Sequence, residues 1–145
     1  MKKPPLRTAR GIAQLCARIA WQKKAEDILV LRLGVLENAP ADYFVLATCS
    51  TETHLRAVAE AIEEATRQRG VANPRREGWE ALQWVLLDYI DVVVHLFRPE
   101  TRAYYRLERL WGDVPQLRLS ERTHRLYTVS LSVPQASEDA PGTVP

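Results

Sequence analysis

The chain has 145 residues, 46% of them hydrophobic, which suffices for one globular domain, and no run approaches the roughly 20 apolar residues of a membrane span. Its net charge of +2 is unevenly divided, because residues 1–25 carry seven basic side chains and no acidic one, whereas the remainder carries 13 basic and 18 acidic side chains. This distribution argues against nucleic acid as the main partner and is compatible with a basic protein partner.

A helix is predicted over residues 8–25, where apolar side chains recur at helical spacing at Ile12, Leu15 and Ile19. A basic start without acidic residues is also typical of an organelle transit peptide. The apolar pattern, however, continues into the next segment without a cleavage-like break. We therefore expect a helix of the folded core rather than a removable signal.

Two strands are predicted next, over residues 27–33 and 42–49, joined by a short loop. Ser50 or Thr51 can cap a second helix, and Gly70 can end it because glycine tolerates left-handed backbone geometry. The apolar positions of this helix keep the helical period and are Leu55, Val58, Ile62 and Ala65.

The segment WVLLDYIDVVVHLF, residues 84–97, predicts two antiparallel strands, with a short edge strand near residues 75–77 before them. Only Tyr89 and Ile90 separate the two aspartates of the segment, so the simplest connection is a two-residue turn. The pairs expected across this hairpin are Asp88 with Asp91, Leu86 with Val93, and Trp84 with His95.

The two faces of the hairpin differ, because side chains alternate along a strand. One face is aliphatic and is expected to pack against helices; it holds Val85, Leu87, Val92, Val94 and Leu96. The other face is mixed, and we predict that it is a docking surface. There Trp84 beside His95 forms an aromatic anchor, and Asp88 and Asp91 add negative charge suited to a basic partner. The alternative is that a further helix covers this face and the tryptophan is ordinary core.

A short helix is predicted after Pro99. In an unbroken helix Tyr104, Leu107 and Trp111 share one face, which we expect to pack, while Tyr105 and Glu108 lie on another face.

The order of these elements predicts an α/β fold in which a mixed β-sheet is sandwiched by helices. Residues 1–119 are expected to form a single domain that includes the N-terminal helix. The apolar pattern weakens from about residue 120, so residues 120–145 are expected to be a flexible tail.

Metal chemistry finds little support in these patterns. His95 lies four residues after Asp91 on one strand, about 13 Å away at 3.3 Å per residue, so the two cannot share an ion. Asp88 and Asp91 could together hold a divalent metal for nucleotidyl transfer. The chain has no glycine-rich phosphate loop, however, and no lysine after Lys24.

The sequence also lacks the motif that a nucleophilic enzyme needs. Cys49 and Ser50 stand where a strand meets a helix, but TCSTE has no glycine to permit a nucleophile elbow. The serine is better explained as a helix cap and the cysteine as a small buried hydrophobe. Cys16 and Cys49 also fit no disulfide framework, which favours a reducing compartment. We expect no catalytic residue, bound metal or cofactor.

Four segments resemble the ribosomal silencing factor family, also called Iojap-like. They are KKAEDILVLRL, ADYFVLATCSTETHLRAVAEAI, EGWEALQWVLLDYIDVVVHLF and RAYYRLERLW, in the family's order over roughly residues 13–115. Two departures stand out. The family usually has glycine where Ile90 stands, and a β-branched residue at that position is strained if φ is positive. The family also tends to have glycine near Cys49.

The resemblance implies a non-catalytic protein that binds the large ribosomal subunit through its ribosomal protein number fourteen. Bound there, it would obstruct docking of the small subunit and lower translation when nutrients run short. The implied fold is an α/β sandwich reminiscent of nucleotidyltransferases without their catalytic apparatus. The implied location is the cytoplasm, or an organelle in a eukaryotic host. The residues expected to contact the ribosomal protein are Trp84, Asp88, Tyr89, Asp91, His95, Tyr105 and Glu108.

Two other functions stay open at this point. A metal-dependent, nucleotidyltransferase-like enzyme would use Asp88 and Asp91, and a nucleic-acid-binding module would use the basic first helix. A homodimer of the free protein is also left open. We expect neither a membrane partner nor direct recognition of nucleic acid.

Overall fold

The computed structural model describes residues 4–130 of the chain. In chain order its elements are α1 (Ala9–Gln22), β1 (Glu26–Arg32), the 3₁₀ helix η1 (Leu33–Val35), β2 (Tyr43–Thr48), α2 (Glu52–Gln68), β3 (Arg75–Glu77), β4 (Trp84–Asp88), β5 (Val92–Phe97), α3 (Pro99–Tyr105), α4 (Leu107–Leu110), β6 (Gln116–Leu119) and β7 (Leu126–Ser130).

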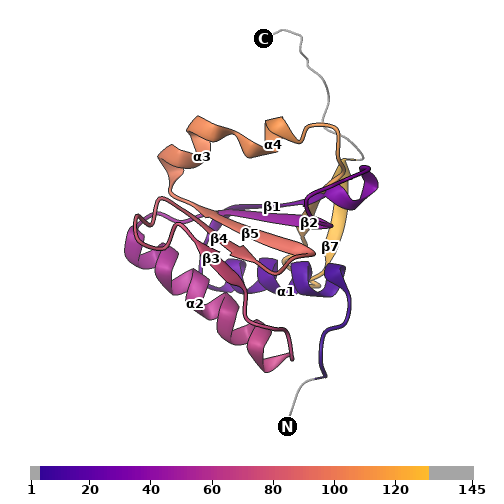
Figure 1. The fold of residues 1–145 in the computed structure, drawn as a ribbon, viewed down its shortest axis with the longest axis horizontal. Helices are drawn as coiled ribbons and strands as arrows, with labels where there is room; N and C mark the ends of the chain where they lie inside the picture. Colours follow the sequence, from indigo (N-terminus) through magenta and orange to yellow (C-terminus); the bar gives the residue numbers. More distant parts are fainter. Residues whose placement is uncertain (1–3, 131–145) are drawn as a thin grey trace, which may run out of the picture.

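One mixed sheet organises the molecule. In the described part, seven strands lie in the order β3-β4-β5-β2-β1-β6-β7. β2 and β5 are parallel, and the other neighbouring strands are antiparallel. The sheet lies between α1 and α2 on one side and α3 and α4 on the other (Figure 1). This arrangement confirms the predicted α/β fold with a mixed sheet between helices.

The layer between the sheet and the helices α1 and α2 is the larger part of the core. The aliphatic face of the hairpin turns toward it, as predicted, and its side chains Val85, Leu87, Val92, Val94 and Leu96 are 0% exposed. Opposite them lie the buried helix residues Ala13, Cys16, Ala17, Leu55, Val58 and Ile62. Full burial of a valine or leucine side chain stabilises a fold by roughly 1.5–3 kcal/mol, so this layer dominates the stability.

Side chains cap both long helices at their first turn. Thr8 Oγ1 accepts a hydrogen bond from the backbone N–H of Gly11 at 2.9 Å, and Thr51 Oγ1 accepts one from His54 at 2.9 Å. Thr51, and not Ser50, is therefore the N-cap of α2. Gly70 follows α2 with φ +79°, which suits the predicted end of the helix.

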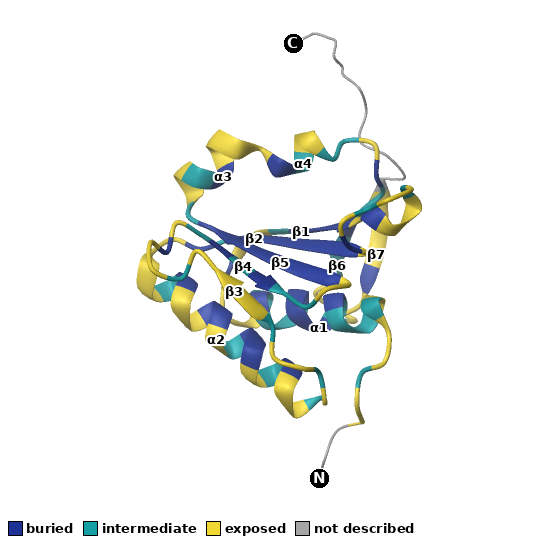
Figure 2. Cartoon of the chain, in the orientation of Figure 1, coloured by how far each residue is buried: buried dark blue, intermediate teal, exposed yellow. Residues whose placement is uncertain are grey.

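The helices α3 and α4 cover much of the mixed face of the sheet, as the alternative interpretation expected, but Trp84, Leu86 and Asp88 of β4 remain half-buried. Leu107 is 8% exposed, and the Trp111 ring meets Phe44 edge-on with ring centroids 6.0 Å apart. Leu110, on the outer side of α4, is 73% exposed. Figure 2 shows buried residues on the sheet-facing side of these helices and exposed ones on the outside. The predicted packing of Leu107 and Trp111 is confirmed.

The predicted helix after Pro99 is interrupted. Arg106 has φ +48° and ψ +54°, in the left-handed region, and separates α3 from α4. Because of this break Tyr104 does not share the buried face of Leu107, and its side chain is 79% exposed. The expected packing of Tyr104 is therefore wrong.

The register of the hairpin differs from the predicted one by two residues. The turn lies at Ile90 and Asp91, because the N–H of Tyr89 donates to the carbonyl oxygen of Val92 at 2.8 Å. The observed pairs are Trp84 with Phe97, Leu86 with His95, and Asp88 with Val93, so the predicted pairs are wrong. A shift of two residues leaves every strand side chain on its predicted face, so the aliphatic face is confirmed, whereas Asp91 lies in the turn and not on the mixed face.

The sheet extends further along the chain than predicted. β7 pairs with β6, and its first residue, Leu126, is 5% exposed in the core. This pairing corrects the predicted domain boundary at residue 119 and adds residues up to 130 to the domain. The remainder of the predicted tail, residues 131–145, lies outside the described residues.

Candidate functional site

Trp84 is the centre of an aromatic row that runs from the core to the surface. Its ring centroid lies 5.1 Å from that of Phe97 and 4.9 Å from that of Tyr105 on α3. The ring of Tyr105 in turn meets Tyr104 with centroids 5.0 Å apart. Trp84 is half-buried, while the two tyrosines are 54% and 79% exposed. Such rings combine apolar contact area with a polar edge, which suits a protein interface.

His95 supports this row from below and does not reach the surface. It is 4% exposed, and its Nδ1 accepts a hydrogen bond from the indole Nε1–H of Trp84 at 3.1 Å. Burial lowers the pKa of His95 to about 3, so the imidazole is neutral at neutral pH and can accept this bond. The expectation of a surface histidine beside Trp84 is corrected: His95 orients the tryptophan from inside.

The Asp88 carboxylate stabilises the turn, Asp91 contributes its backbone, and the two residues do not pair across the strands. Asp88 Oδ1 accepts a hydrogen bond from the N–H of Ile90 at 2.8 Å, and the carbonyl oxygen of Asp91 accepts one from Asp42 at 2.8 Å. Asp88 is half-buried and Asp91 is exposed. Both carboxylates therefore place negative charge near the hairpin tip, but the predicted opposed pair is absent.

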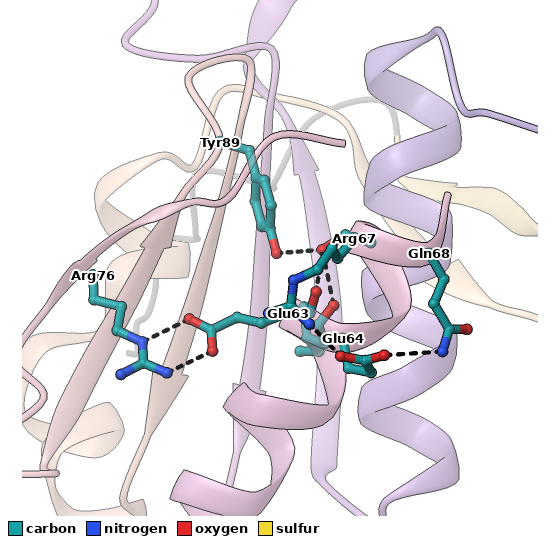
Figure 3. A network of polar contacts seen from close by, with 8 residues as sticks. Glu63, Glu64, Arg67, Gln68, Arg76 and Tyr89 are labelled. Atoms are coloured by element: carbon teal, nitrogen blue, oxygen red, sulfur yellow. Dashed lines mark hydrogen bonds and ion pairs between the residues drawn. The ribbon is translucent and has the colours of Figure 1, made fainter. Parts of the chain in front are cut away.

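Tyr89 turns away from the mixed face and reaches α2 (Figure 3). Its hydroxyl lies 2.8 Å from Thr66 Oγ1, whose own proton is directed to the carbonyl oxygens of Ile62 and Glu63, so the phenol is the donor. Burial raises the pKa of Tyr89. Beside it, Arg76 of β3 binds Glu63 through two hydrogen bonds of 2.7 Å. These contacts make Tyr89 an anchor between the hairpin and α2.

Glu108 is engaged with a buried arginine. Its Oε2 lies 3.6 Å from Nε of Arg102, whose side chain is 7% exposed. Nη1 of Arg102 donates to the carbonyl oxygen of Asp27 at 2.7 Å and to Thr48 Oγ1 at 3.0 Å. The arginine thus joins α3 to β1 and β2, and Glu108 compensates part of its buried charge.

The structure brings some of the predicted binding residues together and separates others. We call docking face the surface formed by Trp84, Leu86 and Asp88 of β4 with Tyr104 and Tyr105 of α3. Of the other predicted contacts, His95 lies beneath this face, Asp91 lies in the turn, Tyr89 faces α2 and Glu108 faces Arg102. Tyr104 was expected to pack instead, because an unbroken helix would turn it toward the core.

The described residues offer little for catalysis. Within residues 4–130 no group of three or more His, Cys, Asp or Glu side chains is placed to hold a metal ion. Burial raises the pKa of Cys49 to about 12, so its thiol stays protonated and is a poor nucleophile. His54 accepts a hydrogen bond at Nδ1 from the N–H of Ser50 at 3.2 Å, and its Nε2–H donates to the carbonyl oxygen of Lys23 at 2.8 Å. This imidazole therefore joins α1 to α2.

The helices of the described part also give no sign of a membrane span. Between residues 4 and 130 none of them is both long and apolar enough to cross a bilayer.

Comparison with known proteins gives a consistent answer. Residues 6–141 match a family model described as ribosomal silencing factor during starvation. The chain is 37% identical over 108 residues to the ribosomal silencing factor of Halalkalibacterium halodurans, covering 74% of this chain and 92% of that protein. To the ribosomal silencing factor of Bacillus subtilis it is 37% identical over 106 residues, covering 73% and 89%.

A relative from Mus musculus is named mitochondrial assembly of ribosomal large subunit protein 1. It is 33% identical over 93 residues, which are 62% of this chain but 40% of that protein.

Solved structures share the fold. A crystal structure of a protein from Chromobacterium violaceum has a TM-score of 0.69 at 31% identity and covers 73% of this chain and 88% of that one. A protein from Bacillus halodurans has a TM-score of 0.62 at 35% identity, covering 70% and 93%. Since the family model spans most of the sequence and the two bacterial silencing factors match over nearly their whole length, this chain belongs to the ribosomal silencing factor family.

Proposed function

We propose that this chain binds the large ribosomal subunit through ribosomal protein number fourteen of that subunit. In this position it obstructs docking of the small subunit and lowers translation when nutrients are limiting. Membership of the ribosomal silencing factor family supports a regulatory role, and the name of the mouse relative connects one member with the large subunit. The structural observation that supports the choice of surface is the aromatic row around Trp84.

The surroundings of Trp84 prepare it for binding. Its indole is fixed by the hydrogen bond to His95 and by ring contacts with Phe97 and Tyr105. Because the ring is already held in one orientation, a partner loses little side-chain entropy by packing on it. Half-buried tryptophans with aromatic neighbours are typical centres of interface binding energy.

Negative charge near the hairpin tip suits a basic ribosomal protein. Asp88 and Asp91 both have access to solvent, so arginines or lysines of a partner can approach them. Charges at the rim of an interface act mainly on the rate of association and on its salt dependence. We therefore assign affinity to Trp84 and steering to the two aspartates.

The test of the tryptophan is the variant Trp84→Ala, assayed for binding to purified large subunits and for inhibition of subunit joining. Removal of a central aromatic anchor costs about 2 kcal/mol or more, so affinity should fall at least about 30-fold. The matched control is Trp79→Ala, because Trp79 is also half-buried but lies against Arg56 and Arg76 on the α2 side. If folded Trp84→Ala binds and inhibits like the parent, the contact surface lies elsewhere.

The test of the charges is the double variant Asp88→Lys with Asp91→Lys. It should associate more slowly with large subunits and lose part of the salt dependence of the association rate. Glu60→Lys, an exposed change on α2, is the control for a general effect of net charge. Equal association rates for all three proteins would remove the aspartates from the interface.

The proposed role is non-catalytic. A metal-dependent nucleotidyltransferase would need Asp88 and Asp91 to hold one cation between them, and the observed turn does not oppose their carboxylates. Divalent-dependent turnover of nucleotides by the purified protein would contradict this part of the proposal. The proposed location is the bacterial cytoplasm or, in a eukaryotic host, an organelle; a relative from Arabidopsis thaliana is named chloroplastic.

A further inference from the structure

A small cavity opens between α1, the end of α2 and the turn that joins β6 to β7. Its volume is about 110 Å³. A cavity of this size has room for a phosphate-sized group. The polar side chains of its lining are Gln14, Arg18, Arg69 and His124, and no carboxylate is among the described residues that line it. The composition of the cavity therefore favours an anion.

The fold holds the donors of this cavity in place. Nε of Arg18 is buried and has no hydrogen-bond partner within residues 4–130. Arg69 donates from Nε to the carbonyl oxygen of Pro4 at 2.6 Å, which fixes its guanidinium at the rim, and the His124 ring lies 5.1 Å from that of Trp21. A buried donor without an acceptor destabilises the fold, and an anion bound at Arg18 would relieve this cost.

A second hollow adjoins the cavity and continues its basic character. The two share Gly11 and Gln14 of α1, and the second, of about 340 Å³, adds Arg10 and Arg125. Nη2 of Arg10 is held by the carbonyl oxygen of Leu126 at 2.9 Å. No acidic side chain of the described chain lines this hollow either. We call basic track the four arginines Arg10, Arg18, Arg69 and Arg125.

We infer that the basic track binds successive phosphate groups of an RNA backbone, and that this RNA is ribosomal RNA beside the docking position. The inference rests on the proposed function, which brings the chain next to the large subunit. Guanidinium groups bind phosphate oxygens in a bidentate manner, and two hollows in series suit a chain of phosphates better than one free anion. Trp21, half-buried beside His124, offers a ring on which an adjacent base can stack.

This surface and the docking face belong to opposite sides of the sheet. α1 lies on one side, and α3, which carries Tyr104 and Tyr105, lies on the other (Figure 1). A protein and an RNA can therefore be contacted at the same time. The acidic balance of residues 26–145 argued against nucleic acid as the main partner, but it averages over the molecule and hides the local charge of the track.

The experiment measures binding of a short labelled RNA hairpin to the full chain over a series of salt concentrations. The parent is compared with Arg18→Gln, Arg125→Gln and the double variant. Each lost phosphate contact should reduce the slope of log affinity against log salt by about 0.7–0.9, and the double variant should lose about 1.5. Arg109→Gln, an exposed change on α4, is the matched control and should behave like the parent.

Two further measurements separate RNA binding from a folding defect and from binding of free phosphate. Arg18→Lys retains the charge and should recover part of the lost slope, which a folding defect would not allow. Inorganic phosphate serves as a second probe. If Arg18→Gln weakens phosphate binding but leaves RNA affinity unchanged, the inference is overturned. Equal RNA affinity and slope in all variants overturns it as well.

The docking face is tested independently in the same assay. Trp84→Ala should bind RNA like the parent, because Trp84 lies on the other side of the sheet. Loss of subunit binding by this variant with unchanged RNA binding is the expected result. If the proposed function fails, Trp84→Ala retains subunit binding; if the RNA contact fails, the arginine variants retain RNA binding.

Discussion

His95 is a buried titratable group whose neutral state the fold requires. The rings of Phe44, Trp84 and Phe97 lie 4.4, 5.9 and 6.0 Å from it, and its pKa falls from 6.5 to about 3 through burial. Below pH 6.5 the unfolded chain therefore binds a proton at His95 that the folded chain does not bind. The stability contributed by the neutral ring is fully present above pH 6.5 and is lost as the pH falls toward 3.

This linkage predicts acid sensitivity. Between pH 7 and pH 5 the parent should lose about 2 kcal/mol of unfolding free energy through His95, most of it below the ordinary histidine pKa of 6.5. His95→Phe cannot be protonated and should show a correspondingly smaller loss, although it is less stable at pH 7 because Trp84 Nε1–H loses its acceptor. Urea unfolding at both pH values measures the difference. Equal losses in the two proteins would mean that another group is responsible.

Ile90 stores strain at the tip of the hairpin. Its φ is +77°, the N–H of Asp91 donates to the carbonyl oxygen of Tyr89 at 3.0 Å across it, and the side chain is 79% exposed. A β-branched residue at positive φ costs about 1–2 kcal/mol, which exceeds the extra entropy that glycine loses on folding. Ile90→Gly should therefore raise the unfolding free energy by about 0.5–1 kcal/mol.

Ile90→Ala is the control for this change, because it removes the branched side chain and retains Cβ. It should recover less stability than glycine, and chemical denaturation of the three proteins measures the order. A stability of Ile90→Gly below that of the parent would show that the isoleucine side chain makes a contact that outweighs its strain.

At the scale of elements, α4 depends on one buried side chain. Leu107 packs on the sheet at 8% exposure, whereas Leu110, one turn later, is 73% exposed. Leu107→Ala should lower the unfolding free energy by about 2–5 kcal/mol, and Leu110→Ala by less than about 0.5 kcal/mol. Thermal unfolding of the pair provides a matched comparison within one helix. A similar loss for both variants would mean that α4 is not held by its sheet-facing side.

Sequence patterns predicted the long elements because their periods are strong. The aliphatic face of the hairpin was predicted correctly although its register is shifted by two residues, since such a shift preserves the face. β6 and β7, with QLRL and LYTVS, escaped prediction because each is short and mixes polar with apolar residues. The place of β6 in the sheet depends on pairing with β1 across the fold, which local periodicity does not encode, and β7 in turn pairs with β6.

The docking face was only partly predictable for a similar reason. Trp84 and Asp88 follow from alternation along one strand, and the structure keeps both on the mixed face. Tyr104 depends on the break at Arg106, where an arginine adopts the left-handed conformation that glycine or asparagine usually marks. The burial of His95 depends also on the ring of Phe44 from β2, which lies far from it in the sequence.

At the scale of the whole molecule, charge and apolar surface are distributed over two sides. The basic track lies with α1 and the β6–β7 turn, while the docking face combines aromatic rings with the acidic hairpin tip. The sheet between them is a rigid spacer, so the relative position of the two surfaces is fixed by the fold.

This arrangement predicts how the two surfaces combine on the ribosome. If both surfaces contact the large subunit at once, the losses in binding free energy of Trp84→Ala and Arg18→Gln should add to within about 0.5 kcal/mol in the double variant. Additivity is expected because the two sites share no partner and lie on opposite sides of the sheet. The measurement is equilibrium binding of the parent, the two single variants and the double variant to purified large subunits at one salt concentration. If the surfaces serve alternative modes of binding, the double variant should instead lose more than the sum, since each single variant can still use the other mode.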